Sequence, residues 1–456
     1  MYKRQGRLSI GVLSKNLPRY IFVLLSLLLL AEGLTMNFGY IRGYAFGSGG
    51  DLDQDYCAAK ALLQGKSIYG DLSVICDTAK QRNRPELENF HPPVTTLLLL
   101  PFVAAGISIQ HMFFLWGMAW VLVYAVVIHR AMSFFGIAPH LRWVLLGFAL
   151  LWFPHLSQSM NGQFSTAILA LVFLGWQWLR DGRDDAGGAA LGAATAIKLF
   201  PGLLGVYLLA TRRYRALAAM AGAFVAIQAL AYFVVGHADF IHFYTHVMPE
   251  DSRRYASVWM NQSFTGTMVA LLQPNPHFQN VLDWPTLGPV LVYGIALALV
   301  AHAARLTWRS GGGDHSYWHF VALAVILCPV SWDHTVVVMA PLCVLLLARF
   351  GSANKQELMF VVAGLMVLAQ VDDLTYVREV IEKVPKIPLG GLWQARAQLW
   401  ASLGITMISA ALLSFPQLAE RKSKKAMERK PFRKRDHCPE VEVQNHRQDS
   451  QDVRCL

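Results

Sequence analysis

Charged residues are scarce in this chain. Only 15% of its 456 residues are Asp, Glu, Lys or Arg, whereas soluble globular proteins carry about 25%. Hydrophobic residues make up 55%, and the apolar runs 20–36, 216–235 and 399–415 approach or reach the roughly 20 residues that a membrane span needs. The composition therefore excludes an ordinary soluble protein and predicts an all-α polytopic membrane protein.

Cysteine is also infrequent, and the first apolar run lacks a small-residue cleavage site. The missing site excludes a cleavable signal peptide. Of the six cysteines, Cys57 and Cys76 fall in one predicted outside loop, where an oxidising compartment permits a disulfide. Because a cysteine count does not fix connectivity, a disulfide and two free thiols are both open.

The net charge of +11 follows membrane topology and does not indicate a nucleic-acid partner. Basic residues precede the first span and follow the last, so the positive-inside rule places both ends on the cytoplasmic side. We predict that the membrane is a bacterial inner membrane. We predict a cytoplasmic segment 1–19, a membrane domain 20–416 with about 12 transmembrane helices, and a basic, disordered cytoplasmic tail 417–456.

Three polar stretches are predicted to lie outside: a long first loop at about 42–93, a second at about 236–284 and a third at about 372–393. Segment 188–209 is about one span long but has arginines on both sides. If both flanks are cytoplasmic, the segment must enter the membrane and return. Two half-helices broken at 198–201 would do this, because proline and glycine at that point interrupt a helix.

The first outside loop begins with three acids, Asp51, Asp53 and Asp55. On an extended segment alternate side chains point the same way, so these carboxylates could share one face. They could form a general base for an acceptor hydroxyl or a metal site. A solvated acidic loop is the alternative.

Lys198 is an ammonium inside an apolar segment, which requires an anionic partner such as a lipid phosphate or a carboxylate. Snorkelling to a helix end is the alternative. Arg253 and Arg254 could hold a phosphate with their planar guanidinium groups. Glu250 and Asp251 beside them offer a plain ion pair instead.

The remaining candidates also fall on the predicted outer side. His91 and His334, the latter beside Asp333, could carry protons near neutral pH or pack at the membrane interface. Four amides at outer helix ends could bind hydroxyl-rich ligands or cap helices. These amides are Asn161, Gln163, Asn261 and Gln262.

Six blocks in this order resemble glycosyltransferase family 87, the polyprenol-phosphate-mannose-dependent transferases of the GT-C class. The first block combines Asp51-Leu52 with the stretch from Tyr56 to Gly65 and Tyr69, and the others are His91-Pro92-Pro93, Asn161-Gly162-Gln163, Lys198-Leu199-Phe200-Pro201, Asn261-Gln262-Ser263 and Ser331-Trp332-Asp333-His334.

The resemblance implies a GT-C fold with a catalytic aspartate in the first outside loop, at Asp51 with Asp53 as the fallback. This carboxylate takes a proton from the acceptor hydroxyl, and polyprenyl phosphate leaves with inversion. Fixed cations would stabilise the leaving phosphate, which we expect of Lys198 with Arg253 or Arg254. His334 is expected to be a second polar residue beside the catalytic base or the donor.

The implied donor is a polyprenyl-phosphate hexose, mannose in the family's commonest case, and the acceptor is an envelope glycan or glycolipid. No cofactor or metal is expected, although Asp51-Leu52-Asp53 imitates a metal motif of nucleotide-sugar enzymes. Two rival functions are a transporter or flippase, which the broken segment would also suit, and an envelope scaffold with a decayed site.

Overall fold

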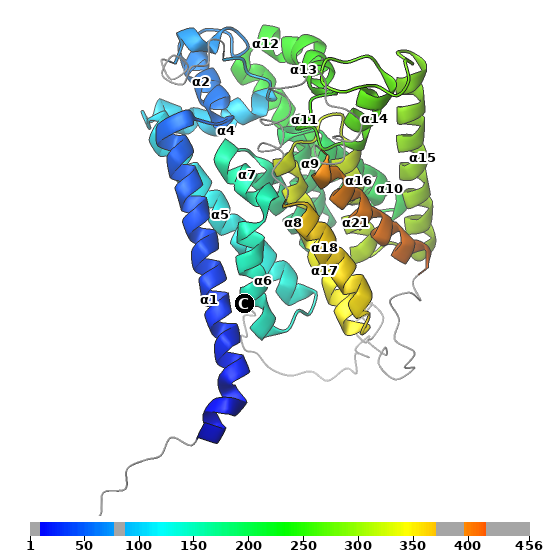
Figure 1. The fold of residues 1–456 in the computed structure, drawn as a ribbon. Coiled ribbons are helices and arrows are strands. Elements are labelled where there is room, and N and C mark those ends of the chain that lie inside the picture. Colours follow the sequence, from blue (N-terminus) through cyan, green and yellow to red (C-terminus); the bar gives the residue numbers. More distant parts are fainter. Residues whose placement is uncertain (1–9, 77–86, 371–395, 416–456) are drawn as a thin grey trace, which may run out of the picture. The chain divides into compact units, whose positions relative to one another are not determined.

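The computed structural model describes residues 10–76, 87–370 and 396–415, and every regular element within these ranges is a helix (Figure 1). The predicted all-helical class is therefore confirmed. The longest helices are α1 (Ile10–Gly43), α5 (Ile109–Phe134), α11 (Tyr214–Val235) and α15 (Leu287–Ser310). The third predicted outside loop and the predicted tail lie outside the described residues.

Six helical stretches are long and apolar enough to cross a membrane by themselves, within the described ranges. A seventh arises if α7 (Phe153–Asn161) and α8 (Ser165–Arg180), bent by 120°, count as one span. The prediction of about 12 crossings is not confirmed. Two predicted spans correspond to helices of only 13 residues, about 20 Å long, whereas the hydrocarbon core is about 30 Å thick. These are α6 (Pro139–Leu151) and α18 (Gln356–Leu368), and α4 (Pro93–Ala104) is similarly short, with 12 residues.

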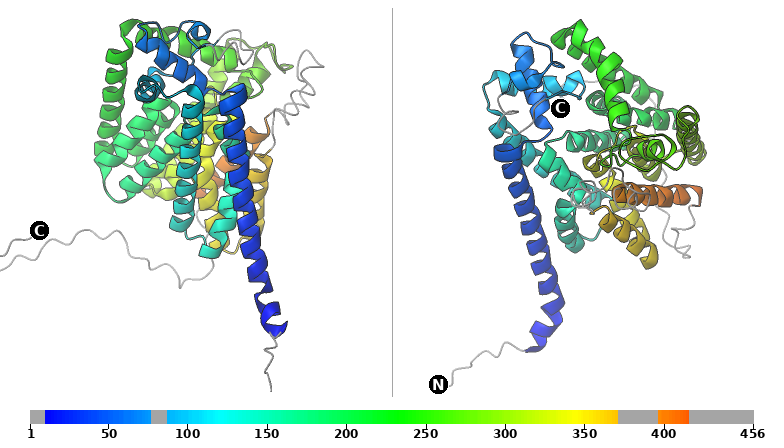
Figure 2. Two further views of the ribbon diagram at one scale, coloured as in Figure 1. Left: turned by 90° about the vertical axis from the view of Figure 1, so that its left-hand side faces the viewer. Right: turned by 45° about the horizontal axis from the view of Figure 1, so that its top comes forward.

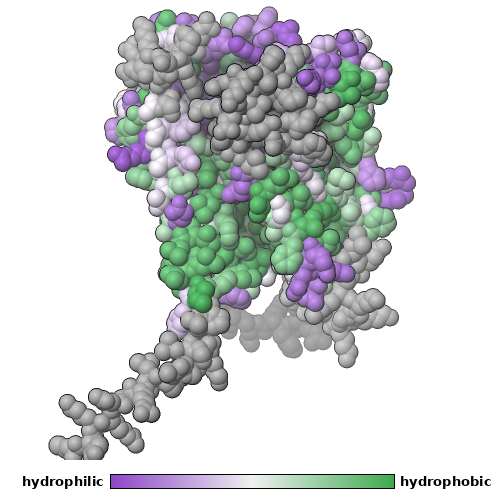
Figure 3. Space-filling model, in the orientation of Figure 1, coloured by the Kyte–Doolittle hydropathy of each residue, from purple (hydrophilic) through white to green (hydrophobic). Residues whose placement is uncertain are grey.

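Hydrophobic side chains face outward on the long helices. Leu297 on α15 is 70% exposed and Phe233 on α11 is 80% exposed. On the face seen in Figure 3, hydrophobic surface lies below a more hydrophilic end. Such apolar exposure is expected where lipid is the solvent. Four more elements pack along the interior: α16 (Asp314–Leu327), η5 (Asp333–Met339), α17 (Ala340–Ser352) and α21 (Ala397–Ser414).

The predicted break at Lys198 is present. Helix α9 (Asp184–Ile197) ends there, and Lys198 has an extended backbone with φ −143° and ψ 140°. A 3-10 turn, η3 (Phe200–Leu203), leads into the short helix α10 (Leu204–Ala210). Pro201 has no N–H to donate and so cannot continue the ladder of α9. The break places the lysine at a point where the chain changes direction.

Short helices gather at one end of the helix bundle, which we call the loop end (Figures 1 and 2). They are α2 (Leu52–Leu63), α4, α12 (His237–His242), α13 (Met248–Tyr255) and α14 (Phe264–Leu272). Short non-α turns join them: η1 (Tyr44–Ser48), η2 (Leu72–Val74) and η4 (Phe243–Val247).

The three acids of the first loop are not extended, contrary to the prediction. Asp51 is the N-cap residue of α2, and Asp53 and Asp55 lie in its first turn, where carboxylates favour a helix through its dipole. On a helix, residues four apart share a face. The helix therefore pairs Asp51 with Asp55 and turns Asp53 away.

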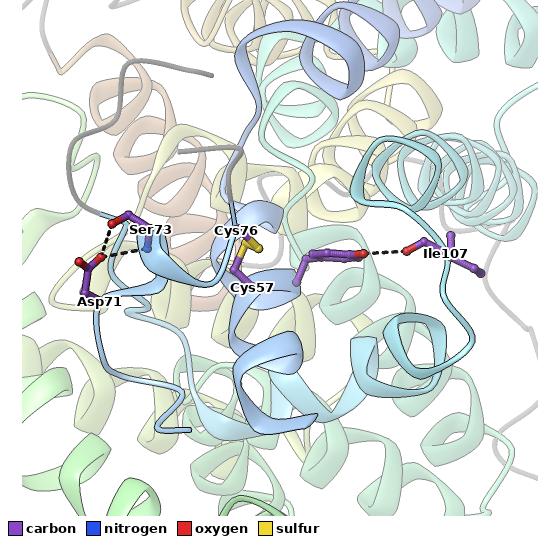
Figure 4. Close-up of a disulfide and its surroundings, with 6 residues drawn as sticks. Cys57, Asp71, Ser73, Cys76 and Ile107 are labelled. Atoms are coloured by element: carbon purple, nitrogen blue, oxygen red, sulfur yellow. Dashed lines mark hydrogen bonds between the residues drawn. A yellow bond between two sulfur atoms is a disulfide. The ribbon is translucent and has the colours of Figure 1, made fainter. Parts of the chain in front are cut away.

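A disulfide joins Cys57 of α2 to Cys76, nineteen residues later (Figure 4). It settles the alternative that the sequence left open. The neighbouring Tyr56 hydroxyl donates to the Ile107 carbonyl oxygen at 2.8 Å, which ties α2 to the segment before α5. The first loop is thus a cross-linked unit attached to the bundle.

Replacing Cys57 and Cys76 with serine is expected to lower the melting temperature. A cross-link that closes a loop of this length contributes about 3 kcal/mol. Differential scanning fluorimetry with and without dithiothreitol measures the effect. The reductant should shift the wild-type protein and leave the double variant unchanged, and an equal shift in both proteins would contradict the prediction.

Candidate functional site

A cleft of about 640 Å³ opens at the loop end. Its walls come from the start of α2, segment 87–92, the turn after α7, the break after α9, helix α13 and segment 328–335. These segments are far apart in the sequence, and they include five of the six blocks singled out above. Eight predicted residues line the cleft: Asp51, His91, Asn161, Gln163, Lys198, Arg254, Asp333 and His334.

Two glycines let the start of α2 approach the turn after α7. A Cβ atom on Gly50 would lie 2.8 Å from the Asn161 carbonyl oxygen. Gly162 has a left-handed backbone with φ +64°, and a Cβ atom there would lie 2.9 Å from the Leu52 Cβ. Glycine is the residue that suits both conditions. The close approach brings Asp51 and Gln163 within hydrogen-bonding distance.

The Gln163 side chain connects the predicted base to the predicted cation. Its Nε2 donates to Asp51 Oδ2 at 2.7 Å and lies 3.3 Å from His91 Nε2. Its Oε1 accepts from Lys198 Nζ at 3.1 Å. Both amide hydrogens and the amide oxygen are thereby used. Lys198 and Asp51 therefore face the same cleft with a neutral amide between them.

Asp55 holds His91 from behind. The Asp55 carboxylate is fully buried, and its Oδ2 lies 2.6 Å from His91 Nδ1. If Nδ1 donates to Asp55, Nε2 is left as an acceptor for the second Gln163 N–H, and a neutral imidazole satisfies both contacts. Sequence reasoning gave Asp55 no role toward His91. The available signal was the four-residue spacing between Asp51 and Asp55, because on a helix this spacing puts both side chains on one face.

His334 lies on the wall formed by segment 328–335. The side chain is 2% exposed, and its ring nitrogens make no hydrogen bond to any residue that the structure describes. Nδ1 lies 3.4 Å from Asp333 Oδ1, and the same oxygen accepts from the His334 N–H at 2.7 Å. The carboxylate thus orients the segment, and the imidazole retains hydrogen-bonding capacity.

Arg254 forms part of the rim. Its Nη1 donates to Glu88 Oε2 at 2.9 Å, and its guanidinium lies 5.7 Å from the centre of the Phe90 ring. The ion pair joins α13 to the end of the first loop. The sequence had offered Glu250 or Asp251 as its partner, so the actual partner is a different acid.

The other four predicted site residues do not line the cleft. Arg253 is exposed and pairs with Glu250, and Asp53 is 2% exposed on another face of α2. Asn261 Nδ2 donates to the carbonyl oxygens of Tyr255, Ala256 and Pro329, and Gln262 Oε1 accepts from the Leu399 N–H at 3.2 Å. Both amides thus bond to backbone groups, Asn261 to three carbonyl oxygens and Gln262 to an N–H in the first turn of α21.

Asp251 is a cleft residue that sequence reasoning assigned only to an ion pair. It is half-buried on α13, and its carboxylate makes no hydrogen bond or salt bridge within the described part of the chain. Loss of water raises its pKa to about 6, and the positive charges of Lys198 and Arg254 partly offset the rise, as does His91 when protonated. A carboxylate without a partner in such a cleft is available to accept hydrogen bonds from a ligand.

Asp251→Asn is expected to stabilise the protein at neutral pH. A carboxyl whose pKa is raised from 3.8 to about 6 costs nothing at pH below about 3, where the group is protonated in both the folded and the unfolded state. The cost grows as the pH rises to about 6 and is constant above. After discounting for solvent, we expect a gain of about 1 kcal/mol. Melting temperatures at pH 4.5 and 7.5 test this, with Glu250→Gln as the exposed control, and an equal gain at both values contradicts it.

A metal site is not evident in the described ranges, because no three His, Cys, Asp or Glu side chains come together there. The cleft instead presents separated carboxylates, one ammonium, two imidazoles and amides. Tyr255 and Trp332 add an aromatic surface, with ring centres 5.3 Å apart. This combination suits a ligand that has both hydroxyl groups and an anionic group.

Comparison with known proteins points in the same direction. The profile of glycosyltransferase family 87 matches residues 89–331, more than half of the chain. The chain is 26% identical over 269 residues to the polyprenol-phosphate-mannose-dependent alpha-(1-2)-phosphatidylinositol pentamannoside mannosyltransferase of Mycolicibacterium smegmatis, covering 56% of this chain and 60% of that protein. It is 25% identical over 370 residues to the polyprenol-phosphate-mannose-dependent alpha-(1-2)-phosphatidylinositol mannoside mannosyltransferase of Mycobacterium tuberculosis, covering 76% of this chain and 82% of that protein. The first match therefore spans less than two thirds of its relative.

Proposed function

The chain belongs to glycosyltransferase family 87, and from this premise we propose that the loop-end cleft transfers a hexose from a polyprenyl-phosphate donor. Mannose is the proposed sugar, and an envelope glycan or glycolipid is the proposed acceptor. The observation that carries the proposal is the single cleft that contains Asp51, Lys198 and Gln163 in direct connection. The names of both relatives support the donor class.

The proposed reaction divides the work between Asp51 and Lys198. The Asp51 carboxylate accepts the proton of the acceptor hydroxyl, whose oxygen forms the new bond to the anomeric carbon of the sugar. The bond from that carbon to the phosphate oxygen breaks on the opposite face, and the configuration inverts. Polyprenyl phosphate leaves with the electron pair, and the Lys198 ammonium stabilises its added negative charge.

The other cleft residues position these two groups. Gln163 holds Asp51 and Lys198, and the buried Asp55 holds His91 beside the same amide. His334 with Asp333 and the rim residue Arg254 are proposed to contact the sugar or the phosphate. Asn161, whose Nδ2 is bonded within its own helix, would offer its amide oxygen to a hydroxyl.

We also propose that the cleft faces the periplasm or exterior of an inner-membrane protein with a GT-C-type arrangement. Basic residues at both chain ends favour the cytoplasm for those ends. The Cys57–Cys76 disulfide supports an oxidising compartment for the first loop. A lipid-linked donor could enter from the bilayer, since it is itself a membrane component.

The test is a transfer assay with purified full-length protein in liposomes. Polyprenyl-phosphate mannose with a radiolabelled sugar is the donor, and total lipid extract from the source membranes supplies acceptors. A new labelled glycolipid, identified by mass spectrometry, is the expected product. The deciding experiment takes the acceptor extract from cells that lack the protein, so that unmodified acceptor is present. If all of the label is then recovered in unreacted donor or free sugar, the proposal is refuted.

A transporter or flippase is the second candidate, because the broken segment at Lys198 is also typical of transporters. The same liposomes distinguish it. A flippase would move labelled donor between leaflets without forming a new glycosidic bond, whereas the transferase forms one.

A further inference from the structure

A second pocket, of about 330 Å³, lies where α10 ends, α11 begins and α15 ends. Helix α11 runs 22 residues from this pocket to the loop-end helix α12, a length of about 33 Å. The pocket and the loop end are therefore about one hydrocarbon thickness apart. We call it the basic pocket, and it is lined by Val206, Leu209, Ala210, Arg212, Tyr214, Ala304, Arg305 and Trp308.

The two arginines of the basic pocket have no acidic partner among the residues that the structure describes. Arg212 and Arg305 make no side-chain hydrogen bond or salt bridge to any described residue, and both are exposed. Three arginines form salt bridges with aspartates at 2.5 to 2.9 Å: Arg180 with Asp314, Arg213 with Asp184 and Arg215 with Asp185. Three arginines outside the pocket thus pair with carboxylates at this end, whereas no described carboxylate pairs with Arg212 or Arg305.

The backbone at Arg212 provides an independent observation. Its φ is 57°, in the left-handed region that non-glycine residues adopt rarely and at a cost of about 1 kcal/mol or more. The position follows a helix end, where glycine is the usual residue. The chain instead has an arginine at this position, and its side chain is part of the pocket lining.

The remaining walls suit a lipid. Trp308 is 59% exposed and Tyr214 is 61% exposed, and such aromatic side chains favour the boundary between headgroups and acyl chains. Exposed apolar side chains continue along α15 away from the pocket, including Leu297. A ligand there would have an anionic group at the arginines and a hydrocarbon chain against the helix.

We propose that the basic pocket binds the phosphodiester headgroup of an anionic phospholipid on the side of the membrane opposite the cleft. Guanidinium groups match phosphate oxygens by paired N–H donors, and basic pockets between membrane helices recognise such headgroups. The acyl chains lie along the outer faces of α11 and α15. The site is separate from the transfer reaction and does not depend on it.

The experiment compares lipid retention by purified full-length protein, measured by native mass spectrometry after exchange into mixed micelles. The probes are phosphatidylglycerol and phosphatidylcholine with identical acyl chains. The test variant combines Arg212→Gly, which suits the left-handed backbone, with Arg305→Gln. The matched control is Arg309→Gln, an exposed arginine on α15 that does not line the pocket.

The wild-type protein and the Arg309→Gln control are expected to prefer phosphatidylglycerol, and the double variant should lose about tenfold in that preference. Unchanged melting temperature in phosphatidylcholine shows that the double variant is folded. Equal preference in the double variant and the control would overturn the site. Inorganic phosphate forms a separate arm, and thermal protection by it that matches phosphatidylglycerol would overturn the lipid assignment in favour of a free anion.

Discussion

Membranes that carry Asp51→Asn are expected to transfer sugar from radiolabelled polyprenyl-phosphate mannose about a thousandfold more slowly than wild-type membranes. General-base catalysis contributes typically 10²–10⁴-fold, and an asparagine cannot accept the hydroxyl proton. The substitution preserves size, and the new amide oxygen can still accept from Gln163 Nε2, so the fold should be kept. Donor KM should change little, because the lost group acts on the acceptor hydroxyl.

Asp53→Asn is the matched control, two residues away on the same helix. Asp53 is buried outside the cleft, so its substitution should preserve the transfer rate at equal protein abundance. Full activity in both variants would show that the general base does not lie in this loop. Loss of activity in Asp53→Asn alone would move the assignment to Asp53, the fallback that the resemblance in the sequence implies.

Lys198→Met is the second substitution with a large expected effect. Methionine retains much of the apolar stem and removes the ammonium, so the leaving phosphate loses its nearest fixed cation. We expect kcat to fall about a hundredfold, as for the loss of one preorganised charge-stabilising donor, and donor KM to rise as well. Steady-state kinetics with labelled donor separates the two effects.

Lys66→Met provides the control for this experiment, because Lys66 is exposed beyond the end of α2. It should leave both constants unchanged. The result that contradicts the assignment is an unchanged kcat in Lys198→Met at normal protein abundance. In that case Lys198 only supports Gln163 through its hydrogen bond to Oε1, and the phosphate is held elsewhere.

Asp51 and Gln163 illustrate how the site could be only partly predicted. Asp51 was identified as a candidate among the acids that begin the first outside loop, and Gln163 from its place at a predicted outer helix end. Their hydrogen bond joins residues 112 positions apart, and it depends on the close approach that Gly50 and Gly162 allow. A sequence pattern contains the two glycines but does not show which surfaces they bring together.

The sequence by itself determined the membrane class, the helical architecture and the break at Lys198. These follow from hydropathy, the positions of basic residues and proline chemistry, which act over one span or less. It did not determine the span count, because short apolar helices and true spans have similar hydropathy and differ in length and packing.

The tertiary structure decided which polar residues share a cleft. It placed the Asp55 carboxylate against His91, left Asp251 without a partner in the described part of the chain, and used Asn261 for backbone contacts outside the cleft. Each outcome depends on the burial and orientation of groups from different helices. Those quantities arise only when the helices pack, because the cost of an unpaired polar group is set by the partners that packing supplies.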